Sequence, residues 1–257
     1  MCELFGVTAK RNIRINSLLE TFFSHSAEHQ NGWGIALFDE DGVSIVREPV
    51  KAIDSSCLKG ILKGNVETSG CIAHIRKATI GDINEKNTHP FSVCDESGRR
   101  WVLAHNGTIF ESEVLRPYQY AQAGTTDSER ILLFIVDQMN RHYRDGLHEV
   151  NREDRMHIVE ESIRAIVPGN KVNLLIYDGE LFYVHKNEPG TLYEKDCDEG
   201  VLISTVPLES DGWSEFPQNR LMVYRSGEPV YAGDRHGDTY IHNEEKMKLL
   251  YFAFSGL

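Results

Sequence analysis

Short apolar, β-branched segments separated by turn residues recur along the chain, and this pattern predicts strands. Asp41-Gly42 and Asp178-Gly179 are dipeptides typical of tight hairpin turns. The predicted strands are Glu3–Ala9, Gly34–Phe38, Val43–Arg47, Cys71–Ile75, Trp101–Ala104, Asn173–Tyr177, Leu181–His185, Val201–Thr205 and Leu221–Arg225.

Four segments repeat apolar residues with a helical period. The clearest begins at Thr126, which with Glu129 forms a predicted capping box. Because strands come in runs with paired helices between them, we expect an α+β fold of two antiparallel sheets with helices packed outside. The polar stretch Asn187–Gly200 is expected to be a surface connection, and the residues after about 210 to be terminal strands and a short tail. The predicted helices are Ile15–His25, Ser56–Leu62, Thr126–Asn140 and Arg152–Ile166.

The composition is that of a globular protein, with 257 residues, of which 40% are hydrophobic and 26% charged. We expect one domain over residues 2–257. The net charge of −12 disfavours nucleic acid as a partner, because phosphate backbones repel an acidic surface. No stretch approaches the roughly 20 apolar residues of a membrane span, and no signal peptide is evident, so we expect a cytoplasmic protein.

Five cysteines at low density argue against a disulfide framework, and reduced thiols are expected. Cys2 is the cysteine that could act as a nucleophile. Removal of Met1 would leave its thiol beside a free α-amine, and the two groups titrate within about one pH unit of each other. A nucleophile and its base would then come from one residue. Taken alone, Cys2 fits better as a small buried packing residue on the first strand.

Three further segments carry candidate chemistry. Arg76 follows a predicted strand, and its planar fork matches a carboxylate. Asp127 could bind an ammonium, although an acidic first turn also simply favours a helix dipole. Asn106-Gly107 has two interpretations: a plain hairpin turn, or an oxyanion hole built from the Asn106 amide and the Gly107 N–H.

Taken in order, these segments resemble one family. The segments are Met1–Gly6, Arg76-x-Ala78-Thr79, Asn87–Phe91, His105-Asn106-Gly107 and Thr126–Glu129. Together they resemble the class II glutamine amidotransferases, which are N-terminal nucleophile hydrolases, and the resemblance is closest to free-standing members. It covers about residues 2–210 and implies a four-layer αββα sandwich.

The resemblance also implies roles for the matched residues. Cys2 is the nucleophile and its α-amine the base, while Asn106 and Gly107 form the oxyanion hole. Arg76 binds the substrate α-carboxylate with help from Thr79, and Asp127 binds the α-ammonium. The expected ligand is glutamine or a γ-glutamyl small molecule, with no metal and no cofactor. A separate synthetase that accepts ammonia is a further expected partner.

Two positions depart from the fused members of the family. Lys77 stands where a tryptophan is common, and Ile80 where a histidine is common. Both flank the expected carboxylate site, so the detailed substrate contacts and the closing motion of this loop are open.

Three alternatives remain at this stage. The first is hydrolysis of a γ-glutamyl amide on a small-molecule conjugate rather than of free glutamine. The second is a non-catalytic, glutamine-binding regulatory protein. The third is a metal hydrolase, since Cys71 and His74 have Cys-x-x-His spacing, with His89 and His105 as further ligands. Any role of Cys2 as an N-terminal nucleophile requires that Met1 be removed.

Overall fold

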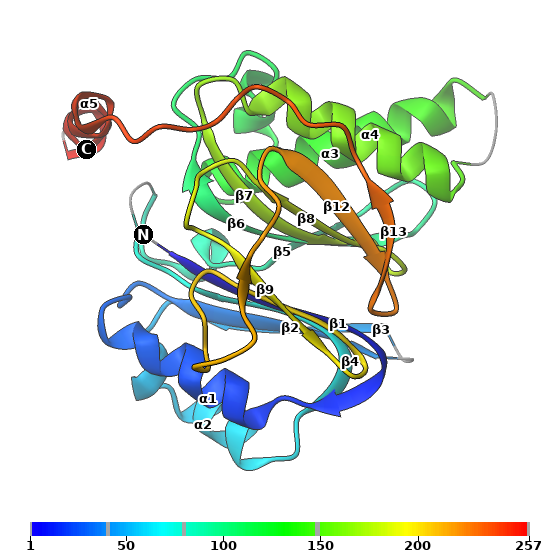
Figure 1. The fold of residues 1–257 in the computed structure, drawn as a ribbon. Helices are drawn as coiled ribbons and strands as arrows, with labels where there is room; N and C mark the ends of the chain where they lie inside the picture. The colour runs from blue at the N-terminus through cyan, green and yellow to red at the C-terminus, as the bar shows by residue number, and fades with distance from the viewer. Residues whose placement is uncertain (1, 40–41, 79–80, 147–149, 256–257) are drawn as a thin grey trace.

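Two antiparallel sheets face each other and helices cover both outer faces (Figure 1). The structure is a computed structural model and describes residues 2–39, 42–78, 81–146 and 150–255. The helices are α1 (Asn16–Ser24), α2 (Ser56–Lys63), α3 (Asp127–Arg144), α4 (Arg152–Ile166) and α5 (Glu244–Ser255), with short 3-10 helices η1 (His25–Ala27), η2 (Ala52–Asp54), η3 (Glu85–Asn87) and η4 (Arg116–Tyr120).

The first sheet has the strand order β11-β9-β10-β1-β4-β2-β3, which places the N-terminal strand at its centre. β1 pairs antiparallel with β10 on one side and with β4 on the other. The strands of this sheet are β1 (Glu3–Arg14), β2 (Trp33–Asp39), β3 (Gly42–Glu48), β4 (Glu67–Ile75), β9 (Tyr193–Cys197), β10 (Gly200–Ser204) and β11 (Ser214–Glu215).

The second sheet has the order β13-β12-β8-β7-β6-β5. Its strand β6 contacts β1 and β4 across the gap between the sheets, which brings distant parts of the sequence together. The strands of this sheet are β5 (Phe91–Cys94), β6 (Arg100–Thr108), β7 (Lys171–Tyr177), β8 (Phe182–Lys186), β12 (Arg220–Arg225) and β13 (Glu228–Ala232).

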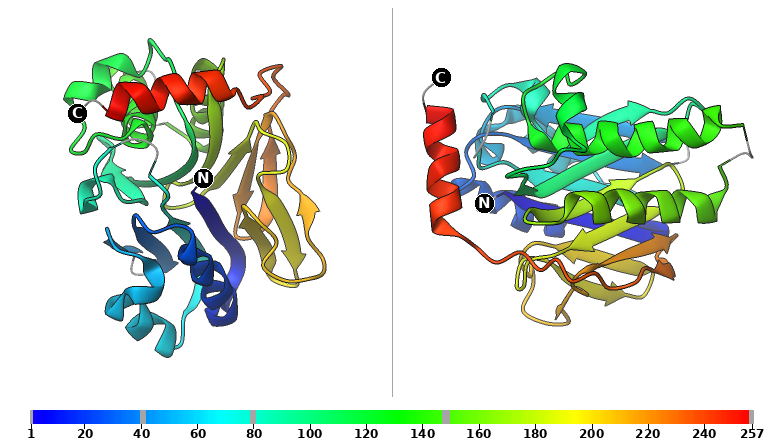
Figure 2. Two further views of the ribbon diagram at one scale, coloured as in Figure 1. Left: turned by 90° about the vertical axis from the view of Figure 1, so that its left-hand side faces the viewer. Right: turned by 90° about the horizontal axis from the view of Figure 1, so that it is seen from above.

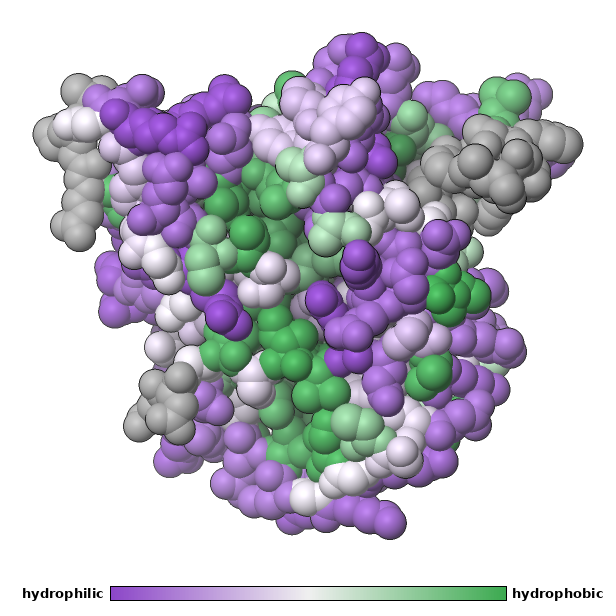
Figure 3. Space-filling model, turned by 180° about the vertical axis from the view of Figure 1, so that it is seen from behind, coloured by the Kyte–Doolittle hydropathy of each residue, from purple (hydrophilic) through white to green (hydrophobic). Residues whose placement is uncertain are grey.

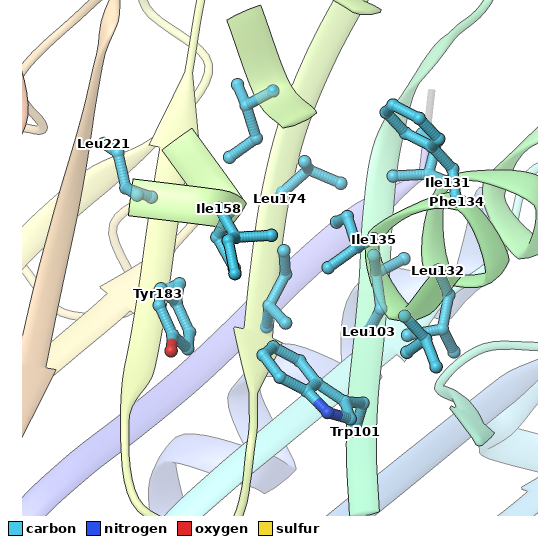
Figure 4. Packing of buried hydrophobic residues seen from close by; sticks show 14 of the residues in the cluster. Trp101, Leu103, Ile131, Leu132, Phe134, Ile135, Ile158, Leu174, Tyr183 and Leu221 are labelled. Atoms are coloured by element: carbon cyan, nitrogen blue, oxygen red, sulfur yellow. The ribbon is translucent and has the colours of Figure 1, made fainter. Parts of the chain in front are cut away.

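Successive side chains of a strand point to opposite faces of its sheet, and this divides the interior into three apolar layers. On β1, Phe5 and Val7 pack toward α1 and α2, whereas Leu4 packs between the sheets. On β6, Trp101 and Leu103 pack beneath α3 and α4, as Figure 4 shows. The predicted four-layer αββα sandwich is thus confirmed.

Every predicted strand and helix overlaps an element of the same type, but three predictions are wrong in detail. The stretch Asn187–Gly200 contains β9, which pairs with β10 near the edge of the sheet. Its side chains are partly exposed, so its sequence is polar and resembles that of a loop. The tail after residue 210 ends in helix α5. The strand at Trp101 continues to Thr108, because Asn106 and Gly107 pair with β7 and form no turn.

The face opposite the one drawn in Figure 1 carries apolar residues down its middle, with polar residues on both sides (Figure 3). Within the described part of the chain, none of the helices has the length and apolarity needed to cross a lipid bilayer.

Candidate active site

The N-terminal end of β1 emerges between the two sheets on the face seen in Figure 2, left. Glu3 pairs with Ile75 of β4, so Cys2 follows at the level of Arg76, where both strands end. Because side chains alternate along a strand, Cys2 shares the inter-sheet face of β1 with Leu4.

A small pocket lies at this point, and four of the six predicted site residues line it: Cys2, Arg76, Gly107 and Asp127. They come from β1, from the end of β4, from β6 and from the first turn of α3. The tertiary fold thus gathers residues from widely separated segments. The other lining residues are Lys77, Ala78, His89, His105, Thr108, Thr126 and Ser128.

The Cys2 sulfur is bracketed by the main chain of one residue. The N–H of Lys77 donates to Sγ at 3.3 Å, and the thiol contacts the Lys77 carbonyl oxygen at 3.4 Å. Burial raises the pKa of the Cys2 thiol, and the hydrogen bond from the Lys77 backbone opposes this shift. A thiol held neutral in this way needs a neighbouring base before it can attack a carbonyl.

The Arg76 side chain is buried and firmly placed. Its Nη1 donates to the Asp82 carbonyl at 2.9 Å and its Nη2 to the Gly81 carbonyl at 3.1 Å. Burial lowers the pKa of the guanidinium, whereas Cys2, when ionised, and the Asp127 carboxylate counteract this effect. An arginine keeps its charge under such a shift, so the pocket holds a fixed cation.

Asp127 supplies the opposite charge. It is the first residue of α3, where the helix dipole favours a carboxylate. Its Oδ2 accepts the Ile109 N–H at 2.8 Å, and its Oδ1 lies 3.3 Å from the Ser128 hydroxyl. The capping box predicted from Thr126 and Glu129 is half correct, since the Thr126 side chain accepts from the Glu129 N–H but the Glu129 side chain does not return to the Thr126 N–H. The Glu129 carboxylate instead accepts from the backbone N–H groups at positions 123 and 124.

Asn106 and Gly107 occupy different places relative to the pocket. Alternation along β6 puts the Asn106 side chain on the inter-sheet face, the same face as Cys2, although Asn106 is not among the described residues that line the pocket. Gly107 lines it. A Cβ at Gly107 would lie 2.0 Å from the Lys171 carbonyl oxygen and 2.2 Å from His105 Nε2, so no larger residue fits.

Thr79, the sixth predicted residue, lies outside the described residues, as does Ile80. His89, Ser128 and Lys77 also line the pocket. Among these three, the sequence pattern assigned no role to Ser128, proposed His89 only as a ligand of the alternative metal site, and placed Lys77 only beside the carboxylate site. His89 and Ser128 belong to segments that carry the family resemblance, which was the available signal.

Two buried histidines of the pocket wall are held neutral in different ways. Burial lowers the pKa of both His89 and His105. Nε2 of His105 lies 3.1 Å from the Lys171 carbonyl, so it carries the proton and leaves Nδ1 to accept from the Ser128 hydroxyl at 3.0 Å. His89 has no hydrogen-bond partner for its ring among the described residues. Arg76 and Asp127 therefore supply the fixed charges of a wall that also contains these neutral rings.

The Cys-x-x-His interpretation as a metal site is wrong. Cys71 packs with the apolar layer beneath α1 and α2, whereas His74, three residues along the same strand, points to the opposite face and contacts the His89 ring in a tilted arrangement. Side chains on opposite faces of a sheet cannot share one ion. The histidines, cysteines and acids of the described ranges include no group of three placed to hold a metal.

Comparisons with known proteins identify relatives of this chain. An uncharacterized protein of Methanocaldococcus jannaschii is 29% identical over 93% of this chain and 73% of its own length. The gamma-glutamyl-hercynylcysteine sulfoxide hydrolase of Mycolicibacterium smegmatis is 25% identical over 80% of this chain and 82% of its own length.

The solved structure of the glutamine phosphoribosylpyrophosphate amidotransferase from B. subtilis superposes with a TM-score of 0.65 at 18% identity, covering 91% of this chain and 49% of that one. At that identity the likeness shows the fold, which is the N-terminal nucleophile hydrolase sandwich. The sequence profile of the class-II glutamine amidotransferases matches residues 1–194. The chain therefore belongs to the class II glutamine amidotransferases.

Proposed function

We propose that this chain hydrolyses γ-glutamyl amides through a thioester on Cys2, once Met1 has been removed. The observation that carries the proposal is the pocket itself, which brings a thiol, a guanidinium and a carboxylate together. A glutamyl group presents a carboxylate and an ammonium at one end and an amide at the other. Arg76 and Asp127 match the charged end, and Cys2 is the group that attacks the amide.

In the first step the α-amine of Cys2 takes the thiol proton, and Sγ attacks the γ-carbonyl carbon. The carbonyl oxygen becomes an oxyanion, which the Asn106 amide and the Gly107 N–H stabilise. The C–N bond then breaks, the leaving amine takes the proton from the α-ammonium, and a γ-glutamyl thioester remains. Removing one donor of an oxyanion hole typically costs about 10²–10³-fold in rate.

In the second step water attacks the thioester carbonyl, with the α-amine of Cys2 as the base. The second oxyanion forms at the same place and is stabilised by the same donors. Its collapse breaks the C–S bond, returns the proton to sulfur and releases glutamate. Thr79 assists Arg76 in holding the α-carboxylate through both steps.

The leaving group defines two versions of this reaction. With free glutamine the product is ammonia, which a separate synthetase would accept. With a γ-glutamyl conjugate the product is a larger amine. The relationship to a hydrolase whose name specifies a gamma-glutamyl conjugate supports the second version.

Replacing the nucleophile tests the proposal. We expect Cys2→Ala to abolish release of glutamate from glutamine and from γ-glutamyl anilides, because the acyl group then has no acceptor. Cys57→Ala is the matched control, since Cys57 is exposed on α2, and it should keep the wild-type rate. Full activity in Cys2→Ala would refute the thioester mechanism.

Blocking the α-amine separates the two functions of Cys2. Insertion of a lysine between Met1 and Cys2 leaves the thiol intact but moves the amine away from it, so we expect loss of turnover. Mass spectrometry of the intact wild-type protein should show that Met1 is absent from active material. Glutamine binding without any turnover by processed protein would favour a regulatory role instead.

A further inference from the structure

Lys77 stands next to the nucleophile and has no role in the chemistry described so far. Its main chain contacts the Cys2 sulfur from two sides, at 3.3 Å through the N–H and at 3.4 Å through the carbonyl oxygen. Its side chain therefore leaves the backbone within one residue of the reacting sulfur. Lys77 also lines the pocket, together with the residues that face the acyl group.

The positive charges of Lys77 and Arg76 lie in different surroundings. Arg76 is buried and donates to two carbonyl groups, whereas Lys77 is exposed and forms no ion pair with any carboxylate of the described residues. Other lysines of this acidic chain do form such pairs. Examples are Lys10 with Glu228, Lys171 with Glu188, Lys186 with Glu215 and Lys195 with Glu209.

If the proposed function holds, a comparison of the charges in the site with those of the substrate indicates which part of the substrate lies near Lys77. The acyl half of a γ-glutamyl amide carries one carboxylate and one ammonium, which Arg76 and Asp127 match one to one. Lys77 adds a positive charge that the acyl half leaves unmatched. The remaining part of a substrate held at the Cys2 sulfur is the amine half.

We propose that Lys77 is a specificity-determining residue that selects γ-glutamyl amides whose amine half carries an anionic group, such as a carboxylate. A lysine is a compact charge on a flexible stem, so it selects by charge and tolerates different shapes. Because the side chain is exposed, the gain is modest, about fivefold or less in kcat/KM, and salt weakens it.

Two chromogenic substrates that differ by one carboxylate test this role. They are γ-glutamyl-4-nitroanilide and γ-glutamyl-3-carboxy-4-nitroanilide. The measured quantity is the ratio of their kcat/KM values, carboxylated over neutral, in each protein. The leaving-group chemistry of the anilines is the same for all variants, and a general loss of activity affects both substrates. Both contributions cancel when ratios are compared between proteins.

We expect Lys77→Gln to lower this ratio by about fivefold and Lys77→Glu to lower it further, while Lys77→Arg keeps most of the preference. Added NaCl should lower the wild-type ratio but leave that of Lys77→Gln unchanged. Lys59→Gln is the matched control, because Lys59 is exposed on α2, on the outer side of the first sheet, and its ratio should equal that of the wild type.

The remaining outcomes separate this proposal from the proposed function. An unchanged ratio in Lys77→Gln, with both anilides cleaved, overturns the role of Lys77 and leaves the thioester mechanism intact. Cleavage of glutamine but of neither anilide shows that the site admits no amine larger than ammonia, and also overturns it. Absence of turnover with all three substrates overturns the proposed function and this inference together.

Discussion

Two pairs of histidines in ring-to-ring contact lie inside the molecule, and their surroundings differ. His74 and His89 have ring centroids 4.1 Å apart at the wall of the candidate active site. His185 of β8 and His236 of the C-terminal segment, which we define as residues 233–243 between β13 and α5, have centroids 5.2 Å apart. Burial lowers the pKa of each of these four imidazoles.

The second pair forms a complete hydrogen-bonded chain. His185 Nδ1 donates to the Val172 carbonyl at 2.8 Å, so its Nε2 accepts from Nε2 of His236 at 2.9 Å. Nδ1 of His236 then accepts the backbone N–H of Asp238 at 3.2 Å. Both rings are neutral in this arrangement, and the chain fastens the C-terminal segment to strand β8.

The first pair lacks such partners. No ring nitrogen of His74 or His89 has a hydrogen-bond partner among the described residues, and the approach of His74 to the His105 backbone falls short of hydrogen-bond geometry. An unpaired buried polar group costs about 1–3 kcal/mol, so this pair destabilises the fold where the other supports it. Such costs concentrate at functional sites, and His89 borders the pocket that holds Cys2.

Acid is the perturbation with the largest expected effect, because it acts on both pairs. Unfolded histidines protonate near pH 6.5, whereas the folded rings stay neutral, and burial lowers the pKa of His185 to about 3. The unfolded state therefore binds more protons, and stability falls as the pH drops below about 6.5. For His74, His89 and His185 together we expect a loss of about 4 kcal/mol between pH 7 and pH 5.5.

Urea titrations at pH 7, 6 and 5.5 measure this loss. The carboxylates with lowered pKa, such as Glu160 and Glu180, contribute only at lower pH, because their stabilisation is lost below about 4.5. The window from 7 to 5.5 thus isolates the histidines. A free energy of unfolding that stays constant across it would show that these rings are protonated in the folded protein.

The pairs also show what could be predicted from the sequence. The sequence shows that His74 ends a strand and that His89 belongs to a segment of the family resemblance. Their lack of hydrogen-bond partners depends on which residues the opposite sheet brings near them. Cys2, Arg76 and Asp127 could be predicted because each side chain has a chemistry that a glutamyl substrate requires. Their convergence in one pocket follows from the packing of β4, β6 and α3, which no local pattern contains.

The strands that the sequence pattern missed, such as β9 and β13, lie at or beside a sheet edge. β9 and β13 have partly exposed side chains, so their composition resembles that of loops. The central strands were predicted because burial on both faces requires continuous apolar runs, as in β7. Asn106 and Gly107 show the reverse effect, since a dipeptide typical of turns is held in a strand by pairing with β7.

Breaking the hydrogen-bonded pair should have the next largest effect. His185→Ala leaves the Val172 carbonyl and the His236 ring unpaired and opens a cavity, so we expect a loss of about 3 kcal/mol at pH 7. The exposed His142 on α3 provides the control, and His142→Ala should change stability by less than about 0.5 kcal/mol. Equal effects of the two variants would contradict a structural role for the pair.

The unpartnered pair should respond in the opposite direction. His74→Leu replaces an unsatisfied ring with an apolar side chain, so we expect a change between zero and about 1 kcal/mol of added stability. Activity should fall by about tenfold, because displacement of His89 disturbs the pocket, and shifts of about 1 Å near reacting groups can cost up to 100-fold. A large loss of stability would mean that His74 has a partner after all.

The smallest expected effect concerns Asp238, whose Oδ2 lies 3.7 Å from Nδ1 of His236. In the hydrogen-bonded chain that nitrogen accepts the Asp238 backbone N–H, so the carboxylate makes no hydrogen bond to it. The carboxylate does raise the pKa of His236 against the effect of burial. Asp238→Asn should therefore leave stability unchanged at pH 7 and cost about 0.5 kcal/mol or less at pH 5.5, since the folded ring then protonates less readily. Urea midpoints at the two pH values measure the difference, and a loss of more than about 1 kcal/mol at pH 7 would indicate that His236 carries its proton on Nδ1.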